Sequence, residues 1–300
     1  MADQTTLLGD VGALIAKLPV ADTAELTQRA ALEGFDILCR KLFGNRSLAD
    51  VVATLFPEHT PPEAAEVAKR ISLNAIRNAC WKSIMETPGV SEATILAPDR
   101  EAIAALRKEQ GPAILAFWHF GPVNMLTIAF RHIGVPVLAI ARTTPTRWTD
   151  APDLLKMRIN VLNASPREMV TAVRRCLEHL KRGGKVAIAV DGSLRKDDIK
   201  VPFLGRQFAV GRGTAALARL SGAPVIPCTM HWERTGWAMA IRIFEPLAVP
   251  SLPADDAEEY ERAVLASLAR RFEAHGRRYP GQFKVDQLAE LINSPGLVGH

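Results

Sequence analysis

The feature that most constrains the fold is an alternation of short apolar runs with helical segments between residues 112 and 244. The apolar runs, each short enough for one strand, are 112–117, 135–140, 185–190, 224–230 and 238–244. The segments with helical periodicity between them are 122–132, 168–181 and 213–220. Short apolar strands that alternate with helices are typical of a parallel sheet buried on both faces. The sequence therefore predicts an α/β fold with a mainly parallel central sheet flanked by helices.

Helical extensions are expected at both ends of this core. Apolar residues recur at helical spacing within residues 22–90 and again within 260–272, where Asp255 and Asp256 stand near the expected helix start. We expect an N-terminal helical region over 1–95, an α/β core over 96–250 and C-terminal helices over 251–300. The C-terminal helices are expected to pack on the core in a single structural unit.

Charge and apolar patterning narrow the classes of partner. The formal net charge is +5, which favours contact with something acidic, such as an anionic membrane surface, a phosphate-bearing molecule or an acidic carrier protein. The basic residues are scattered and form no run, so nucleic acid is not expected. No segment approaches the roughly 20 apolar residues of a membrane-spanning helix. We expect a cytoplasmic protein, either free or peripheral on the inner membrane face.

Cysteines and histidines give no sign of a metal site. The four cysteines form no C-x-x-C pair, and His119, His132, His179 and His231 show no ligand spacing. No metal and no bound cofactor are therefore expected.

The first candidate site follows the strand predicted at 112–117. His119 comes two residues after this strand, and Pro122 opens the helix that follows. Ligands of open α/β sheets bind at the carboxyl ends of the strands, so His119 lies where substrates usually bind. Gly121 is a candidate for close approach to substrate, and Asn124 is close enough in sequence to orient the imidazole. A base with a hydrogen-bonding orienter is the arrangement of general-base catalysis.

The second candidate site follows the strand predicted at 185–190. A carboxylate, a glycine, a hydroxyl and a guanidinium come within five residues there, at Asp191, Gly192, Ser193 and Arg195. Gly192 permits close backbone approach, and Arg195 is suited to binding phosphate through two parallel hydrogen bonds. Arg142, just after the strand predicted at 135–140, is a further candidate for a phosphate on either substrate.

The order and spacing of these blocks resemble the lysophospholipid acyltransferase superfamily, most closely its lipid A biosynthesis (late acyltransferase) branch. His119 to Asn124 is similar to the H-x4-D/E motif of that family, and Asp191 to Arg195 to its second block. The segments 201–206, 223–227 and 279–283 also look like that branch. The resemblance covers about residues 100–285 and implies a glycerolipid acyltransferase-like fold.

By this resemblance His119 is the general base. It takes a proton from a hydroxyl or amine acceptor, which then attacks an acyl thioester directly. The implied acyl donor is acyl-coenzyme A or the phosphopantetheine thioester of an acyl carrier protein. Asp191, Gly192, Ser193 and Arg195 would line the acceptor side.

The sequence departs from the family pattern at Asn124, where the family has an acidic residue. A neutral amide accepts the imidazole N–H but adds no charge to stabilise an imidazolium. Three interpretations follow. The acceptor is an easily activated group such as an amine, another carboxylate such as Asp191 is the partner, or transfer activity has been lost.

Other functions stay open beside acyl transfer. A thioester hydrolase would use His119 to activate water, and a catalytically impaired scaffold would only bind an acyl group or a carrier protein. Residues 211–216 fit a loose G-x-G-x-x-G/A pattern with Glu233 twenty residues beyond Gly213, which leaves a nucleotide-dependent oxidoreductase as a remote alternative. A serine hydrolase is not expected because no G-x-S-x-G motif is present.

Overall fold

The central element of the fold is a mainly parallel sheet, as predicted. The computed structural model describes residues 39–85, 95–96, 100–108, 111–141, 158–161, 164–192, 198–233, 238–248 and 256–296. Within these ranges the sheet has seven strands in the order β1-β9-β8-β2-β5-β3-β4. Their bounds are β1 Ile95–Leu96, β2 Ala113–Phe117, β3 Leu138–Ala141, β4 Arg158–Asn160, β5 Lys185–Ala189, β8 Val225–Trp232 and β9 Met239–Ile243. Among the strand pairs described in this seven-stranded sheet, only β8–β9 is antiparallel.

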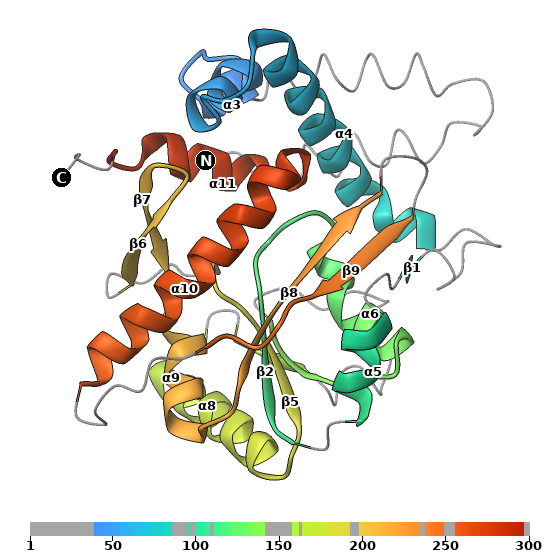
Figure 1. The fold of residues 1–300 in the computed structure, drawn as a ribbon, viewed down its shortest axis with the longest axis vertical. Coiled ribbons are helices and arrows are strands. Elements are labelled where there is room, and N and C mark those ends of the chain that lie inside the picture. Colours follow the sequence, from blue (N-terminus) through green and yellow to red (C-terminus); the bar gives the residue numbers. More distant parts are fainter. Residues whose placement is uncertain are drawn as a thin grey trace.

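Helices cover both faces of this sheet. Figure 1 shows α8 and α9 on one side of the strands and α5 and α6 on the other. Their bounds are α5 Arg100–Lys108, α6 Leu126–His132, α8 Pro166–Lys181, α9 Gly213–Ser221 and α10 Ala257–Arg278, and the 3₁₀ helix η2 Val123–Met125 precedes α6. β2 is buried along almost its whole length and β8 along all of it, which explains why their sequences are continuously apolar instead of alternating.

The two faces of the sheet have separate apolar cores. Ile114 and Ala116 of β2 face a large core shared with α8, α9 and α10, whereas Ala113 and Leu115 face a smaller core shared with α5 and α6. The alternation continues beyond the strand, since Trp118 and Phe120 are buried in the large core. His119, between them, is therefore directed away from that core, and its side chain is 31% exposed.

A hairpin over residues 199–210 was not predicted from the sequence. β6 Ile199–Phe203 and β7 Arg206–Val210 pair antiparallel and form a separate two-stranded sheet. β6 alternates between buried and exposed residues, a pattern that indicates a strand but spans only five residues and includes Pro202. Leu204 and Gly205 both have positive φ, as a two-residue hairpin turn requires.

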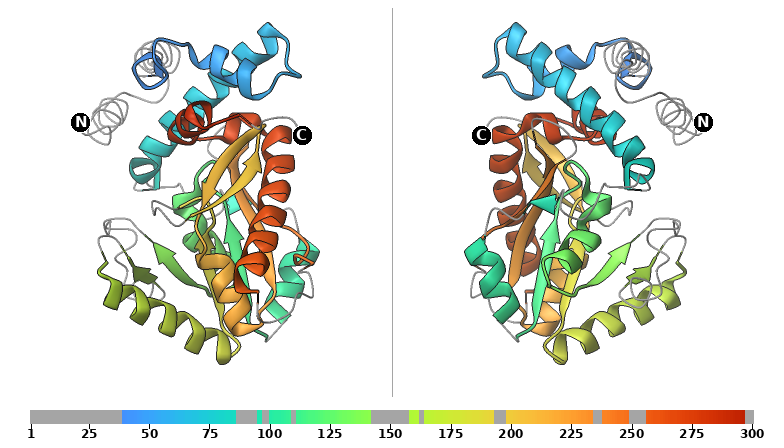
Figure 2. Two further views of the ribbon diagram at one scale, coloured as in Figure 1. Left: turned by 90° about the vertical axis from the view of Figure 1, so that its left-hand side faces the viewer. Right: turned by 90° about the vertical axis from the view of Figure 1, so that its right-hand side faces the viewer.

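Helices from both ends of the chain lie over the edge of the sheet at which β2 and β8 end. These are α3 Leu48–Leu55, α4 Pro61–Met85, the 3₁₀ helix η3 Pro280–Gln282 and α11 Val285–Asn293. Figure 2 shows this group from two sides. Asn74 of α4 donates from Nδ2 to the carbonyl of Gly281 at 2.8 Å, and α11 contacts α3 and β7. The division at residues 95 and 250 stays a prediction, because these contacts do not test it.

Local sequence signals explain where the long helices begin. Ser165 and Glu168 form a reciprocal capping box at the start of α8, with Pro166 in the first helical turn. The Asp256 side chain accepts the backbone N–H of Glu259 at 2.9 Å and so caps α10. α10 then contacts β6 and α9, and its Leu265, Leu268 and Phe272, all fully buried, belong to the large core.

Candidate active site

His119 and Asp191 come together at the carboxyl ends of two neighbouring strands. β2 and β5 pair in parallel, and the backbone N–H of Val190 donates to the carbonyl of Phe117 at 2.9 Å just beyond the paired residues. This register brings the residues that follow the two strands side by side. Nδ1 of His119 lies 2.7 Å from Oδ1 of Asp191, although the residues are 72 apart in sequence.

The Asp191 carboxylate is completely buried but well supplied with hydrogen bonds. Its side chain is 0% exposed, and both oxygens accept the backbone N–H of His119, at 3.0 and 3.2 Å. Because a carboxylate can only accept, the proton of the neutral imidazole lies on Nδ1 and the lone pair on Nε2. A partly exposed imidazole with a buried carboxylate behind it is an arrangement that supports general-base catalysis.

The C-terminal helix α11 and the residue just before it contribute two further groups that sequence reasoning missed. The Gln287 side-chain amide donates to Oδ2 of Asp191, and Gln287 itself is buried. Burial of the Lys284 ammonium lowers its pKa, while the charges of Asp286 and Asp191 act in the opposite direction. Gln287 lies 96 residues beyond Asp191, and no local motif marks it.

Of the two predicted glycines, Gly192 borders the imidazole and Gly121 forms a tight turn two residues after His119. A Cβ on Gly192 would lie 3.6 Å from Cε1 of His119, so this backbone borders the ring directly. Gly121 has φ +48°, and a Cβ there would lie within 2.7–2.9 Å of Gln282, Met230 and His231. Only glycine fits the turn at residue 121.

The structure describes only some of the other predicted site residues. The backbone of Asn124 lies in η2, at the start of the predicted helix, but its side chain is outside the described part of the structure. Arg142, Ser193 and Arg195 also lie outside the described residues. Among the predicted site residues, the structure therefore brings His119, Asp191, Gly192 and the Gly121 turn together.

The segment Tyr279 to Phe283, noted in the sequence for its resemblance, supports the turn after His119. The Gln282 carbonyl accepts the backbone N–H of Gly121 at 2.8 Å. The Gln282 side-chain amide pairs with both backbone polar groups of Trp232, at 2.9 and 3.0 Å. Phe283 packs edge-on against Phe120 with ring centroids 4.9 Å apart. This segment therefore fixes the backbone from which His119 projects.

Two further histidines, His231 and His275, have ring centroids 5.9 Å apart, and His275 packs on Phe120. His275 is buried, and its Nε2 lies 3.2 Å from the Thr229 hydroxyl. Burial, with added repulsion from His231, Arg242 and Arg278, lowers the pKa of His275 to about 3. His231 is stacked on Tyr279 at 5.0 Å, so these rings form a packed layer and not an open site.

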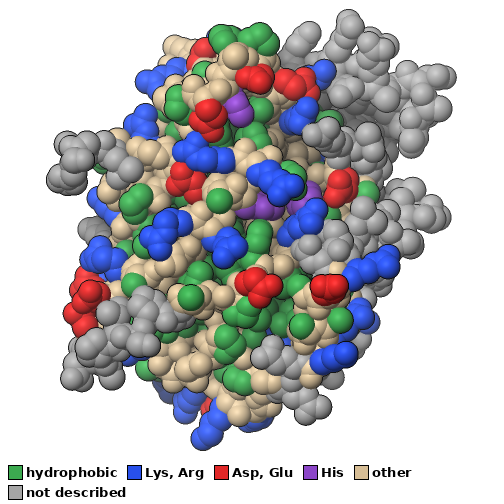
Figure 3. Space-filling view, in the orientation of Figure 1, with side chains coloured by type: hydrophobic (Ala, Val, Ile, Leu, Met, Phe, Trp, Pro, Cys, Tyr) green, Lys and Arg blue, Asp and Glu red, His purple; other side chains and the backbone are tan. Residues whose placement is uncertain are grey.

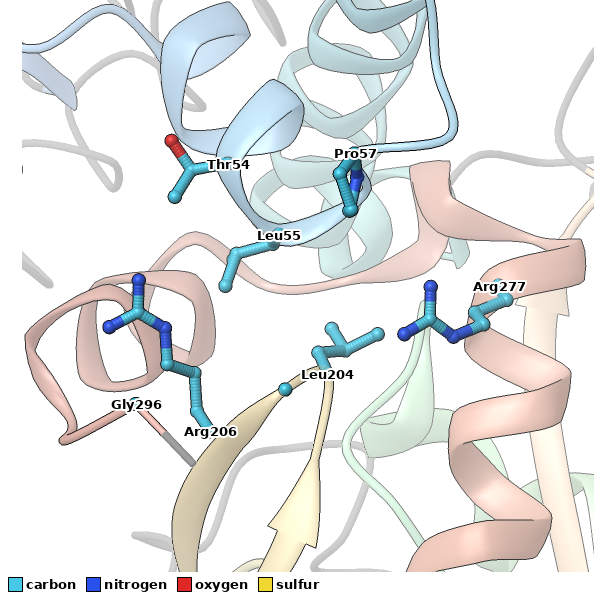
Figure 4. A pocket seen from close by; sticks show the side chains of 8 residues that line it. Thr54, Leu55, Pro57, Leu204, Arg206, Arg277 and Gly296 are labelled. Carbon is cyan, nitrogen blue, oxygen red and sulfur yellow. The ribbon is translucent and has the colours of Figure 1, made fainter. Parts of the chain in front are cut away.

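A hollow of about 320 Å³ lies away from His119, between α3, the β6–β7 turn and α10. Figure 4 shows Leu55 and Leu204 at its centre, with the guanidinium groups of Arg206 and Arg277 on either side. Arg277 is paired with Glu58 at 2.8 Å and with Glu273 at 2.9 Å. None of the residues around His119 lines this hollow. The Arg277 guanidinium is already paired with two carboxylates, so it offers little free charge to a ligand.

The face of the molecule shown in Figure 3 carries side chains of mixed charge. In Figure 3 basic side chains are spread over the visible face among acidic and apolar ones, without one continuous patch. Within the described ranges, no group of three His, Cys, Asp or Glu side chains is arranged to hold a metal ion. No helix among the described segments has both the length and the apolar character needed to cross a membrane.

Comparison with known proteins identifies the family to which the chain belongs. Residues 63–283 match the sequence profile of the bacterial lipid A biosynthesis acyltransferases, and this match spans most of the chain. The chain therefore belongs to that acyltransferase family. No individual curated protein matches the sequence significantly. Among solved structures, the chain is similar to the 1-acyl-sn-glycerophosphate acyltransferase PlsC from Thermotoga maritima, with 17% identity and a TM-score of 0.39 over 81% of this chain and 97% of that one.

Proposed function

We propose that the protein transfers an acyl group from a thioester to a hydroxyl or amine acceptor, with His119 as the general base. The observation that carries this proposal is the 2.7 Å pairing of a partly exposed His119 with the buried carboxylate of Asp191, in a chain of an acyltransferase family. The acyl donor is acyl-coenzyme A or an acidic acyl carrier protein. No metal or bound cofactor takes part.

The reaction proceeds through direct attack of the acceptor. Nε2 of His119 takes the proton of the acceptor hydroxyl or amine as its oxygen or nitrogen bonds to the thioester carbon. The tetrahedral intermediate then expels the thiolate, and the imidazolium returns the proton to sulfur to give the free thiol. Asp191 holds Nδ1–H and stabilises the positive charge that the ring carries between the two proton transfers.

Asp191 takes the place of the acidic residue that the sequence lacks at position 124. Of the three interpretations of Asn124, a carboxylate from another strand is the one that the His119–Asp191 contact favours. With Nδ1–H donated to Asp191 and Nε2 acting as the base, neither ring nitrogen is left for Asn124, so this proposal does not use Asn124 as the orienter. Gly121, Gly192, Ser193 and Arg195 border the acceptor, and Arg142 binds a phosphate of either substrate.

The charge of the whole chain agrees with an acidic partner. The net charge of +5 favours an anionic lipid surface or an acidic carrier protein. The protein is accordingly proposed to act in the cytoplasm or on the inner membrane face as a peripheral protein.

The test is thioester consumption, measured as free thiol release. Acyl-coenzyme A and acyl carrier donors are each supplied with and without cell extract as a source of acceptor. His119→Ala is compared with wild type and with His59→Ala, a histidine whose ring stacks on Phe56 in the α3–α4 connection. The proposal predicts acceptor-dependent release that only His119→Ala abolishes. Release without an acceptor would indicate a hydrolase, and no release from thioesters that still bind would indicate a scaffold.

A further inference from the structure

Each oxygen of the Asp191 carboxylate has its own side-chain partner. Oδ1 lies 2.7 Å from Nδ1 of His119, and Oδ2 accepts the side-chain amide of Gln287. Both oxygens also lie close to the backbone N–H of His119. The two side-chain partners therefore define which oxygen faces the imidazole.

The orientation of the Gln287 amide is fixed from its other end. Its Oε1 accepts the backbone N–H of Lys284 at 3.3 Å, at the start of α11. With the oxygen held there, the NH₂ group is the part directed at Asp191. Leu288 and Leu291 of the same helix are fully or almost fully buried in the large core, so α11 is anchored next to the site.

This arrangement has a mechanical consequence for the imidazole. A carboxylate held only by His119 can rotate about its Cβ–Cγ bond, because that torsion has a broad energy profile. A second hydrogen bond on Oδ2 restricts this rotation, and the position of Oδ1 then determines both the angle of the ring and the nitrogen that carries the proton. Asp191 follows β5 whereas His119 follows β2, so the local backbone does not fix the carboxylate against the imidazole. The orientation of the carboxylate therefore depends on the additional hydrogen bond from Gln287.

We propose that Gln287 is a positioning residue that holds the Asp191 carboxylate so that His119 keeps its proton on Nδ1 and its lone pair on Nε2. This inference rests on the proposed role of His119 as the base. Gln287 itself touches no substrate and acts through Asp191. A C-terminal helix of this chain thereby sets the tautomer of a histidine that lies 168 residues earlier in the sequence.

The test uses Gln287→Met, which keeps the length and volume of the side chain and removes the amide. Asn293→Leu is the matched control, because this amide on the same helix donates only to the carbonyl of Ala289 within the described structure, at 2.8 Å. The full-length protein is labelled with ¹⁵N-histidine, and the His119 signals are assigned by their loss in His119→Gln. Side-chain ¹⁵N shifts are recorded without substrate, at a pH where the histidines are neutral, and kcat and KM are measured in parallel.

The inference predicts that wild type and Asn293→Leu hold His119 in the Nδ1–H tautomer. In Gln287→Met the two tautomers mix, and kcat falls by up to about 10²-fold with KM nearly unchanged, since misplacement of a catalytic group costs that much. An unchanged tautomer in Gln287→Met would overturn the inference, even if kcat falls through loss of stability. Failure of the proposed function is separate, because it would show as transfer activity retained by His119→Ala.

Discussion

His119 and His275 are both neighbours of Phe120, one in sequence and one by ring packing, but their surroundings differ in charge and in access to water. His119 is 31% exposed and faces the buried carboxylate of Asp191. His275 is buried beside a neutral hydroxyl, with the cations Arg242 and Arg278 near it. The ring of Phe120, one residue after His119, packs on His275 with centroids 5.7 Å apart.

The difference shows what a histidine needs in order to take up a proton during a reaction. An imidazolium at His119 would be stabilised by Asp191 and by partial exposure to water, whereas at His275 it would meet burial and like charges. Burial and these like charges lower the pKa of His275 to about 3, so this side chain is neutral near pH 7 and fills a packing position. Four predictions test this contrast, and the largest expected effect comes first.

Removal of the carboxylate behind His119 should have the largest effect on rate. Asp191→Asn keeps the shape of the side chain but removes its charge, and we expect kcat to fall on the order of 10⁴-fold, as in triads with the same change. Thiol release under saturating acyl donor measures it. Glu245→Gln, which removes an exposed carboxylate after β9, is the control. A loss of less than tenfold in Asp191→Asn would mean that His119 does not depend on this carboxylate.

The stability of the protein should be most sensitive to a small steric change at Gly121, in the turn after His119. In Gly121→Ala the new Cβ would lie within 3 Å of Gln282, Met230 and His231, at φ +48°. We expect the free energy of unfolding to drop by about 3 kcal/mol, since strain at positive φ adds to the clash. Gly205→Ala is the control, because its φ is also positive (+70°) but nothing lies within 4 Å of its Cβ position. Equal losses in urea unfolding of the two variants would rule out a close contact at the turn.

The buried histidine should affect the pH dependence of stability. The pKa of His275 is about 3 in the folded protein, below the ordinary value near 6.5, so between these values the unfolded chain binds a proton that the folded chain does not. Its contribution to stability is fully present above pH 6.5 and is lost as the pH falls toward 3. Wild type should therefore lose about 2 kcal/mol more than His275→Gln between pH 7 and pH 5. The free energy of unfolding is measured by urea titration at each pH. Equal losses in wild type and His275→Gln would show that His275 is not held neutral.

The smallest effect is expected beside the imidazole. In Gly192→Ala the new Cβ would lie 3.4 Å from Cβ of Ala189 and 3.6 Å from Cε1 of His119, which are ordinary contact distances. We expect the free energy of unfolding to change by less than about 1 kcal/mol and kcat/KM to change by less than about tenfold. Steady-state kinetics with both acyl donors measures the change. A loss as large as that of Asp191→Asn would mean that substrate passes directly over residue 192.

Most of the sheet could be predicted from the sequence, because five of its strands lie in apolar runs and the helices between them show clear periodicity. The two short edge strands, β1 and β4, were not predicted, since they have only two and three residues. β2, β5 and β8 coincide closely with the runs predicted at 112–117, 185–190 and 224–230. The β6–β7 hairpin could not be predicted, because its turn has Leu204 where a turn of this geometry usually has Asn, Asp or Gly. The Leu204 side chain is almost fully buried, which offsets the strain of its positive φ.

The candidate site was predictable only where its residues follow strands. His119 and Asp191 each stand two residues after the end of a strand, and parallel strands place such residues at one edge of the sheet. The sequence left open whether Asn124 or Asp191 pairs with the imidazole, because the order of strands in space is not written in the chain. Gln287 carries no local signal, since its role follows from the way α11 packs beside α3 and β7.

The most direct test of the account is a double-mutant cycle on His119 and Asp191. Acceptor-dependent thiol release is measured for wild type, His119→Ala, Asp191→Asn and the double variant, each checked for a folded state by thermal unfolding. If Asp191 acts through His119, the double variant will be no slower than His119→Ala alone, because residues that act as a unit are strongly non-additive. Losses that multiply in the double variant, or transfer activity that survives in His119→Ala, would contradict the account.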